Sequence, residues 1–479
     1  MSEPALTLTG GEVAEAAEGR VVRGDARAPF GVFGIDSRAI VAGQLFVAIA
    51  GERHDGHAFV GDALDRGARG VVVAAGRGEA AIGREDQPAV VPEPIVIEVS
   101  DTTVALQRMG RAMRRKSGAR LIAITGSAGK TTTKEVAAAF LALRHQTFRN
   151  RGNLNNHIGL PLSLLELGRD GAVPSMAVVE LGMSAPGEIR TLLGIAEPDV
   201  RVWTNVAEAH LEHFPSVEAI ADAKAEILEG ADADAVLVAN GGDARVMARA
   251  ARFAGRTVTF DLDRPADVSA TNIESLGIRG MAADVATSEG SVRLETPLVG
   301  RGNLANVLAG LAVGLDAGVP LDAMAARAAT LTPPAHRGEV REFASGITVI
   351  DDAYNANPLA VEKALDVLGA EATGRRVAVL GEMLELGPES ASLHARVGRA
   401  AARAGVAVLV TVGGEPARAL GRGAQDAGLG ADAVRHAATS DEAAQIVADL
   451  VRPGDVVLVK GSRGVRLERV VDRLAEGAR

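Results

Sequence analysis

The chain has 479 residues, more than one hydrophobic core usually contains, so we expect about three domains. Its formal net charge of −10 argues against a general affinity for nucleic acid or anionic membranes, and the absence of cysteine excludes disulfides, iron–sulfur clusters and thiol catalysis. No basic segment with an apolar stretch opens the sequence, and no apolar run reaches about 18 residues, so we expect a cytoplasmic protein without membrane insertion.

The first hundred residues alternate short apolar runs with glycine-rich turns, which predicts a small α/β domain over residues 1–102. We expect a helix over 57–66, a surface loop over 76–94 and a helix over 103–116 that leads into the next domain. The expected strands are 32–35, 44–49, 70–74 and 95–99.

From residue 121 the pattern becomes an alternation of strands and helices, typical of a mostly parallel sheet covered on both faces. A helix is predicted over 130–142, and short alternating segments within 255–298 predict a small antiparallel patch. The central domain should cover 103–332. Its expected strands are 121–125, 176–180, 200–206 and 235–239.

A third alternating block follows Pro333 and Pro334 and predicts a Rossmann-like, doubly wound domain over 333–479. An alternative, in which 105–479 forms one large domain, stays open. The expected strands are 347–352, 376–380, 407–412 and 455–460, and the expected helices are 360–368, 390–404 and 441–450.

The strand 121–125 runs into the loop Gly126-Ser127-Ala128-Gly129-Lys130-Thr131, which opens the next helix. Backbone N–H groups of such a loop, together with the helix N-terminus, bind phosphate. Lys130 would reach the β- and γ-phosphates and Thr131 a magnesium ion. The spacing is shorter than usual, because Ile124 stands where the first glycine is expected. We predict ATP binding; a glycine turn without function is the alternative.

Magnesium beside those phosphates needs hard oxygen ligands. Glu180 ends a predicted strand, where ligands of open α/β sheets bind, although a solvated strand-end carboxylate is the alternative. His210 taken alone is more typical of a loop or packing residue, and histidine is a poor first choice for magnesium. Lys224, taken alone, is interpreted as an exposed helix lysine.

Several separate motifs together resemble the Mur ligase family, whose ATP-dependent members add amino acids to UDP-N-acetylmuramic acid. The most specific is 351–358, which resembles the version in the branch that adds D-alanyl-D-alanine to UDP-N-acetylmuramoyl-tripeptide. The resemblance extends over nearly the whole chain. The other motifs are the phosphate loop in the family's shortened form (125–135), 153–156, 180–183, 204–212, 381–387 and 458–462.

The resemblance implies a UDP-binding first domain, a central ATP-binding domain and a third domain that binds the incoming dipeptide. It assigns Thr131, Glu180 and His210 to magnesium. Lys224 would hold a second magnesium ion after carbamylation, which converts the ammonium into a carboxylate-like group. Lys130, Glu180, His210, Lys224 and Arg337 would then be the catalytic residues.

The resemblance also assigns the substrate contacts. Arg337 and Asp352 would close over the phosphates and ribose of ATP, and Asn303 would contact the adenine, although Gly302 replaces the family's usual histidine. A helix-capping turn is the alternative role of the residues before Pro358. ATP would be held by Gly126, Ser127, Ala128, Gly129, Lys130, Thr131 and Thr132, and the other substrates by Ser37, Arg38, Asn156, Tyr354, Asn355 and Asn357.

The activity implied is transfer of the γ-phosphoryl group of ATP to a carboxylate, followed by attack of the dipeptide amine on the acyl phosphate. The family expectation is a monomer. The alternatives are another amide ligase of the superfamily (a diaminopimelate-adding enzyme or folylpolyglutamate synthetase), a P-loop ATPase switch and an inactive Mur-like subunit. The absence of an Asp-Asn-Pro-Arg motif argues against the diaminopimelate-adding enzyme, and the UDP-type first domain argues against the folate enzyme.

Overall fold

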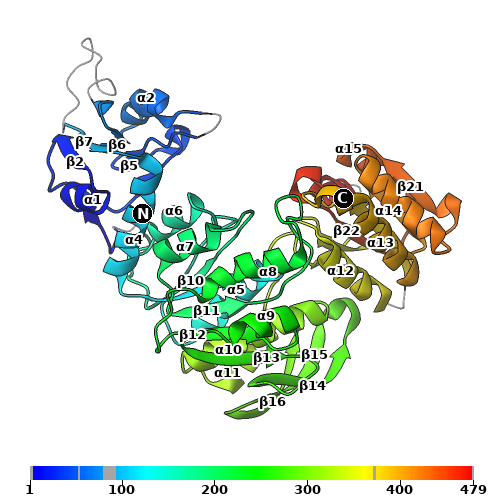
Figure 1. Ribbon diagram of the computed structural model, residues 1–479. Helices are drawn as coiled ribbons and strands as arrows, with labels where there is room; N and C mark the ends of the chain where they lie inside the picture. Colours follow the sequence, from blue (N-terminus) through cyan, green and yellow to red (C-terminus); the bar gives the residue numbers. More distant parts are fainter. Residues whose placement is uncertain (1–3, 52–53, 79–92, 371–373, 477–479) are drawn as a thin grey trace. The chain divides into compact units, whose positions relative to one another are not determined.

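The computed structural model describes residues 4–51, 54–78, 93–370 and 374–476 (Figure 1). Most of the loop expected over 76–94 therefore lies outside the described residues. The chain forms two compact units, one of residues 1–124 and 144–201 and one of residues 125–143 and 202–479. Among the described residues, no helix has the length and apolar character needed to cross a membrane.

The first domain is built on a five-stranded sheet in which only the edge strand β2 runs antiparallel to its neighbour. Helix α2 (Val60–Asp65), preceded by the 3-10 turn η2 (Gly56–Phe59), replaces the single helix expected over 57–66 and covers one face of the sheet. The strand order is β2 (Arg20–Arg23), β7 (Ile95–Val99), β6 (Gly70–Ala74), β5 (Leu45–Val47), β4 (Phe33–Gly34).

The sequence-based prediction missed the start of this domain, where helix α1 (Gly10–Ala16) follows strand β1 (Leu8–Thr9). Thr9 accepts a hydrogen bond from the Glu12 N–H, and Glu12 accepts one from the Thr9 N–H, so α1 begins with a capping box. β1 pairs with β3 (Pro29–Phe30).

Helix α4 (Thr102–Ser117) is bounded by local signals at both ends. Asp101 accepts hydrogen bonds from the N–H groups of Thr103 and Val104, and Gly118 ends the helix in the left-handed conformation. The helix predicted over 103–116 is confirmed.

The central sheet has nine strands in the order β16-β15-β14-β13-β12-β11-β8-β10-β9. β8, β9 and β10 run parallel, as do β12 and β13. Nearly all residues of β8, β10 and β12 are buried, as expected for a covered parallel sheet, whereas β9 and β13 are partly exposed. Their bounds are β8 (Arg120–Thr125), β9 (Thr147–Arg149), β10 (Met176–Glu180), β11 (Val200–Trp203), β12 (Val236–Asn240) and β13 (Arg256–Asp261).

Two expectations for this sheet need correction. The strand expected over 200–206 ends at Trp203, because the residues that follow turn toward the phosphate loop. The antiparallel patch is formed by β14 (Val268–Ser275), β15 (Met281–Thr287) and β16 (Gly290–Thr296), but β13 belongs to the parallel part of the sheet.

The third domain contains a six-stranded sheet in the order β17-β18-β22-β19-β20-β21, parallel except for the edge strand β17 (Glu339–Glu342). Its strands alternate their side chains between two cores, one under α12, α13 and α14 and one under α15 and α16, which confirms a doubly wound domain. The strand bounds are β18 (Thr348–Asp352), β19 (Arg375–Gly381), β20 (Val408–Val412), β21 (Val434–Ala437) and β22 (Asp455–Lys460), and the helix bounds are α12 (Pro358–Ala370), α13 (Ser390–Arg403), α14 (Glu415–Asp426), α15 (Ser440–Leu450) and α16 (Glu468–Glu476).

Helix α14 was not predicted, because Gly421 and Gly423 interrupt its helical pattern. α14 packs closely against α13, where a Cβ at Gly423 of α14 would lie 2.2 Å from the Ala395 carbonyl oxygen of α13. Gly423 therefore serves close contact between the two helices and does not mark a turn, and Gly421 faces the sheet at Val434.

Candidate active site

The phosphate loop joins β8 to helix α5 (Lys130–Leu141) through two glycines with positive φ, +150° at Gly126 and +84° at Gly129. A Cβ at Gly126 would lie 1.9 Å from Thr204 Oγ1, and a Cβ at Gly129 would lie 2.4 Å from Asn306 Oδ1. Both glycines are therefore needed, and the predicted strand, glycine loop and helix are present.

A second segment, 204–207, holds the loop in shape. Thr204 Oγ1 donates to the Ala128 carbonyl at 2.7 Å, and Asn205 both donates to that carbonyl and accepts from the Ala128 N–H, each at 2.9 Å. The Ala207 N–H donates to Ser127 Oγ at 2.9 Å. Sequence reasoning missed Thr204 and Asn205, although they open the 204–212 motif.

Lys130 occupies the first position of α5. Its Nζ donates to the Gly126 carbonyl at 2.8 Å, so the cation lies over the loop that it is expected to serve. Thr131 and Thr132 follow in the first turn and are buried.

Glu180 ends β10 and is 4% exposed, so the alternative of a solvated strand-end carboxylate is wrong. Asn155 Nδ2 donates to Glu180 Oε1 at 2.9 Å, and the Glu180 N–H donates to Asn150 Oδ1 at 3.2 Å. The 153–156 motif thus positions this carboxylate through Asn155, which sequence reasoning did not single out.

Asn156 is exposed and precedes helix α6 (Gly159–Leu164), where its Oδ1 accepts from the N–H groups of Ile158 and Gly159. It also lines a pocket of about 280 Å³. The predicted substrate residue therefore lies beside a cavity, together with Gln107, His157, Gly182, Glu188, Thr191 and Leu192.

His210 has a φ of +61° and its Nδ1 is hydrogen-bonded to Glu385 Oε2. This bond holds the pKa of Glu385 below its usual range. The Glu212 N–H donates to the Glu385 carbonyl at 3.0 Å, so the 204–212 and 381–387 motifs meet here. Within the described parts of the chain, no three His, Asp or Glu side chains gather as a metal site.

Lys224 lies in the last turn of α8 (Val217–Ala225) and is 2% exposed. Its interpretation as an exposed helix lysine is therefore wrong. A lysine is rarely this deeply buried without a specific role or partner, which makes the burial of Lys224 informative.

Asn303 lies in the first turn of α10 (Arg301–Asp316), where its Nδ2 donates to the Val299 carbonyl at 2.9 Å and its Oδ1 accepts from Asn306 at 3.2 Å. Beside it, a Cβ at Gly302 would lie 3.2 Å from Lys363 Cδ. The side chain of Lys363 thus lies beside position 302, where the family usually has a histidine side chain.

Tyr354 follows β18 and faces two guanidinium groups. The Arg337 guanidinium carbon lies 4.0 Å from the ring centre, and that of Arg463 lies 5.6 Å away. Asp352, at the end of the same strand, forms an ion pair with the buried Lys460 at 2.6 Å, and Lys460 also donates to the Asn355 carbonyl at 3.0 Å. Arg463 and Lys460 were not predicted, although both belong to or adjoin the 458–462 motif.

Asn357 connects this region to the phosphate loop. Its Oδ1 accepts from the Ala360 N–H, which confirms the helix-capping role before Pro358, and its Nδ2 donates to the Ser127 carbonyl at 3.4 Å. Asn357 therefore both caps the helix and contacts the phosphate loop.

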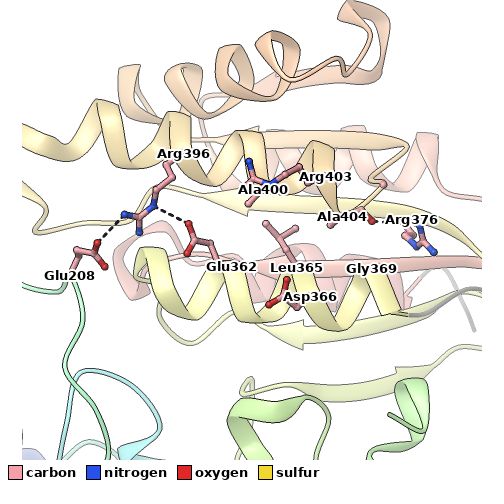
Figure 2. A pocket seen from close by; sticks show the side chains of 11 residues that line it. Glu208, Glu362, Leu365, Asp366, Gly369, Arg376, Arg396, Ala400, Arg403 and Ala404 are labelled. Carbon is pink, nitrogen blue, oxygen red and sulfur yellow. Dashed lines mark hydrogen bonds and ion pairs between the residues drawn. The ribbon is translucent and has the colours of Figure 1, made fainter. Parts of the chain in front are cut away.

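Figure 2 shows a pocket of about 860 Å³ beside α12 and α13. Arg396 on α13 bridges Glu208, in the loop after β11, and Glu362 on α12, each at 2.9 Å. This bridge fixes the loop that carries His210 to the third domain, and sequence reasoning missed it.

In the first domain, Arg38 binds the carboxylate of Asp36 through two hydrogen bonds of 2.9 and 2.8 Å and lowers the pKa of Asp36 to about 2. Ser37 is buried in the same turn. His57 Nδ1 lies 2.6 Å from Asp55, and its Nε2 accepts from the Ala74 N–H. Residues 36–38 and 55–57 thus each begin a hydrogen-bonded 3-10 turn capped by an aspartate.

Models of one family match three parts of the chain. The model of the Mur ligase family catalytic domain matches residues 30–114, that of the Mur ligase middle domain residues 124–314, and that of the Mur ligase glutamate ligase domain residues 336–463.

Relatives match over nearly the full length. The chain is 33% identical over 449 residues to the UDP-N-acetylmuramoyl-tripeptide–D-alanyl-D-alanine ligase of Bacillus subtilis, with 92% of each chain covered. The chain belongs to the Mur ligase family. It is 35% identical over 443 residues to the Escherichia coli protein of the same name, with 92% of this chain and 93% of that one covered. The predicted family and the predicted ATP-dependent ligase class are confirmed.

Solved structures of Mur ligases have the same fold. MurF from Acinetobacter baumannii matches with a TM-score of 0.86 at 29% identity, covering 99% of this chain and 100% of that one. MurF from Thermotoga maritima in complex with ADP matches with a TM-score of 0.78 at 28% identity, covering 93% and 97%. Folylpolyglutamate synthase from Mycobacterium tuberculosis shares the fold alone, with a TM-score of 0.61 at 20% identity over 78% of this chain and 94% of that one.

Proposed function

We propose that this Mur ligase joins D-alanyl-D-alanine to the terminal carboxylate of UDP-N-acetylmuramoyl-tripeptide at the expense of ATP. The observation that carries the proposal is the nearly full-length identity of 33% and 35% with two ligases of that name. The 351–358 motif supports the same substrate, because it lies at the carboxyl end of β18, where open sheets bind ligands.

The phosphate loop fits a nucleotide. Gly126 and Gly129 let the loop backbone pack directly against Thr204 and Asn306, and Lys130 Nζ lies at the Gly126 carbonyl. Thr132 and the first turn of α5 add the N–H groups and partial positive charge of a helix N-terminus. We assign the contact with the adenine ring of ATP to Asn303.

In the proposed reaction the γ-phosphoryl group passes to the tripeptide carboxylate and forms an acyl phosphate. The amine of the dipeptide attacks the acyl carbon, and the tetrahedral intermediate collapses to the amide and inorganic phosphate, leaving ADP as the other product. Lys130 and Arg337 would neutralise charge on the transferred phosphoryl group, which is the main catalytic need of such a step. Asp352 would contact the ribose.

Magnesium would be held by Thr131, Glu180, His210 and a carbamylated Lys224. The chemistry of these groups fits, because Glu180 is a buried carboxylate fixed by Asn155, and Lys224 is buried where carbamylation would supply another acidic oxygen group. Magnesium bound there would neutralise charge on the β- and γ-phosphates. Dependence of turnover on bicarbonate would test the carbamate on Lys224.

The remaining assignments follow the same proposal. The UDP group would bind the first domain (1–102) near Ser37 and Arg38, and the peptide near Asn156. The central domain would be 103–332 and the dipeptide-binding domain 333–479, and the enzyme would act as a cytoplasmic monomer. The dipeptide would contact Tyr354, Asn355 and Asn357.

The test is phosphate release with UDP-N-acetylmuramoyl-tripeptide, ATP and magnesium, offering D-alanyl-D-alanine, diaminopimelate or glutamate in turn. We expect release only with D-alanyl-D-alanine. Release without any amine donor would favour an ATPase switch, and release with diaminopimelate alone would favour another branch of the family.

A further inference from the structure

Arg463 lies where β22 has ended and the 3-10 turn η7 (Arg463–Val465) begins. Its side chain is 60% exposed, and its guanidinium group faces the Tyr354 ring, which also faces Arg337. β18 and β22 are neighbouring parallel strands, so both Tyr354 and Arg463 follow the carboxyl ends of the sheet. Exposed side chains at that edge are placed to meet a ligand.

The charges around Tyr354 do not balance. Arg463 Nη1 lies 3.1 Å from Glu468 Oε1, whereas Arg337 has no carboxylate within ion-pair distance among the described residues. The nearby Asp352 is already paired with Lys460. Arg463 therefore has one carboxylate partner and an otherwise exposed guanidinium group, which can bind a further anion, whereas Arg337 is assigned above to the phosphoryl group of ATP.

Glu468 fixes the position of Arg463, but its second oxygen is an acceptor that lacks a donor and so does not itself indicate an anionic ligand. Its Oε2 atom is buried and has no hydrogen-bond partner in the part of the chain that the structure describes. A buried carboxylate oxygen without a donor is unfavourable. The other oxygen fixes Arg463, so Glu468 positions the guanidinium group at the edge of the cluster.

We propose that Arg463 binds the free carboxylate of the incoming dipeptide, with Glu468 as its positioning residue. This inference rests on the proposed function and adds how the enzyme recognises a chain end. The planar guanidinium fork matches a carboxylate with two parallel hydrogen bonds, and a ring beneath it keeps its plane in place. Recognition of the carboxylate selects a free dipeptide over a dipeptide that lacks this charge.

The test compares D-alanyl-D-alanine with its C-terminal amide in the full-length enzyme. The wild type should prefer the free acid, and Arg463→Met should raise the KM for the free acid about 10- to 100-fold, the range expected for loss of charge-assisted hydrogen bonds. The KM values for the amide and for ATP should not change. Arg463→Lys keeps the charge but loses the planar fork of the guanidinium group. Its KM for the free acid should lie between those of the wild type and Arg463→Met.

The matched control is Arg473→Met on α16, because Arg473 pairs only at the surface with Glu476. It should leave all KM values unchanged. An equal rise in KM for acid and amide in Arg463→Met, or a wild type that does not distinguish them, would overturn the assignment, and the wild-type comparison needs no variant to fold. A wild type inactive with both compounds would instead overturn the proposed function, and this assignment with it.

Discussion

The phosphate loop and the cluster around Tyr354 are built in different ways. The loop depends on backbone, with two glycines at positive φ and hydrogen bonds from Thr204 and Asn205 to the Ala128 peptide groups. The cluster depends on side chains from distant segments, as in the pair between Asp352 and Lys460. A site built from backbone groups can be recognised in one short stretch of sequence. A site built from side chains of distant segments can be recognised only once the domain has folded.

The largest effect should come from Lys130, the cation of the phosphate loop. Lys130→Ala removes the cation over the phosphates and should lower turnover about 1,000-fold or more, by analogy with other charge-stabilising residues of phosphoryl transfer. Phosphate release measures the loss, and circular dichroism should show an intact fold. Turnover near that of the wild type would remove Lys130 from the catalytic set.

A second change tests the backbone of the loop directly. Gly129→Ala should destabilise the protein by more than the roughly 1–2 kcal/mol of a left-handed alanine, because its Cβ would also meet Asn306 Oδ1 at 2.4 Å. Gly187→Ala is the matched control, since Gly187 also begins a helix in the left-handed conformation but has open space around it. If urea unfolding gave the same decrease in the free energy of unfolding for both variants, Asn306 would be shown to move aside without an energetic cost.

A third change tests the side-chain-built region. Asp352→Asn leaves the buried Lys460 without its carboxylate and should lower the free energy of unfolding by about 2 kcal/mol, less than for a fully buried pair because Asp352 is partly exposed. Asp263→Asn breaks an exposed pair with Arg301 and should cost less than about 1 kcal/mol. If both variants unfold at the same urea concentration, the Asp352 pair is not structural.

The smallest expected effect lies in the first unit, at an ion pair outside both regions. Glu197 accepts hydrogen bonds from Arg115 and Arg111, which lower its pKa to about 2. A depressed carboxyl pKa stabilises the folded state above the unfolded pKa of about 4.5, and this stabilisation is lost as the pH falls toward 2.

Glu197→Gln should therefore lower the free energy of unfolding by about 1 kcal/mol at pH 7, after allowing for exposure of the pair. The difference in this free energy between variant and wild type should shrink as the pH falls from 6 to 3. Unfolding midpoints across that range measure it. A difference that grows on acidification would contradict the assigned pKa.

Much of the fold follows from local pattern. β6, β7, β10 and β22 were predicted with the bounds they have, because buried parallel strands are continuous apolar runs between turn residues. α14 was missed because a glycine there serves helix packing, and β17 because this edge strand contains one apolar residue and has no apolar run.

The site was predictable only in part. Lys130 and its loop follow from local sequence, but Lys224 was interpreted as exposed because burial is decided by the helices and strands around it. Residues such as Asn155, Glu385 and Arg396 act on other residues that are 25 to 188 positions away. Apart from their presence in a motif, nothing in the neighbouring sequence indicates which distant residues these side chains contact.

The most direct test of the proposed chemistry is a label transfer. UDP-N-acetylmuramoyl-tripeptide labelled with ¹⁸O in its terminal carboxylate should be joined to D-alanyl-D-alanine with ATP, and the released phosphate analysed by mass spectrometry. An acyl phosphate predicts one labelled oxygen in phosphate for each amide formed. Amide formation with unlabelled phosphate would contradict the account.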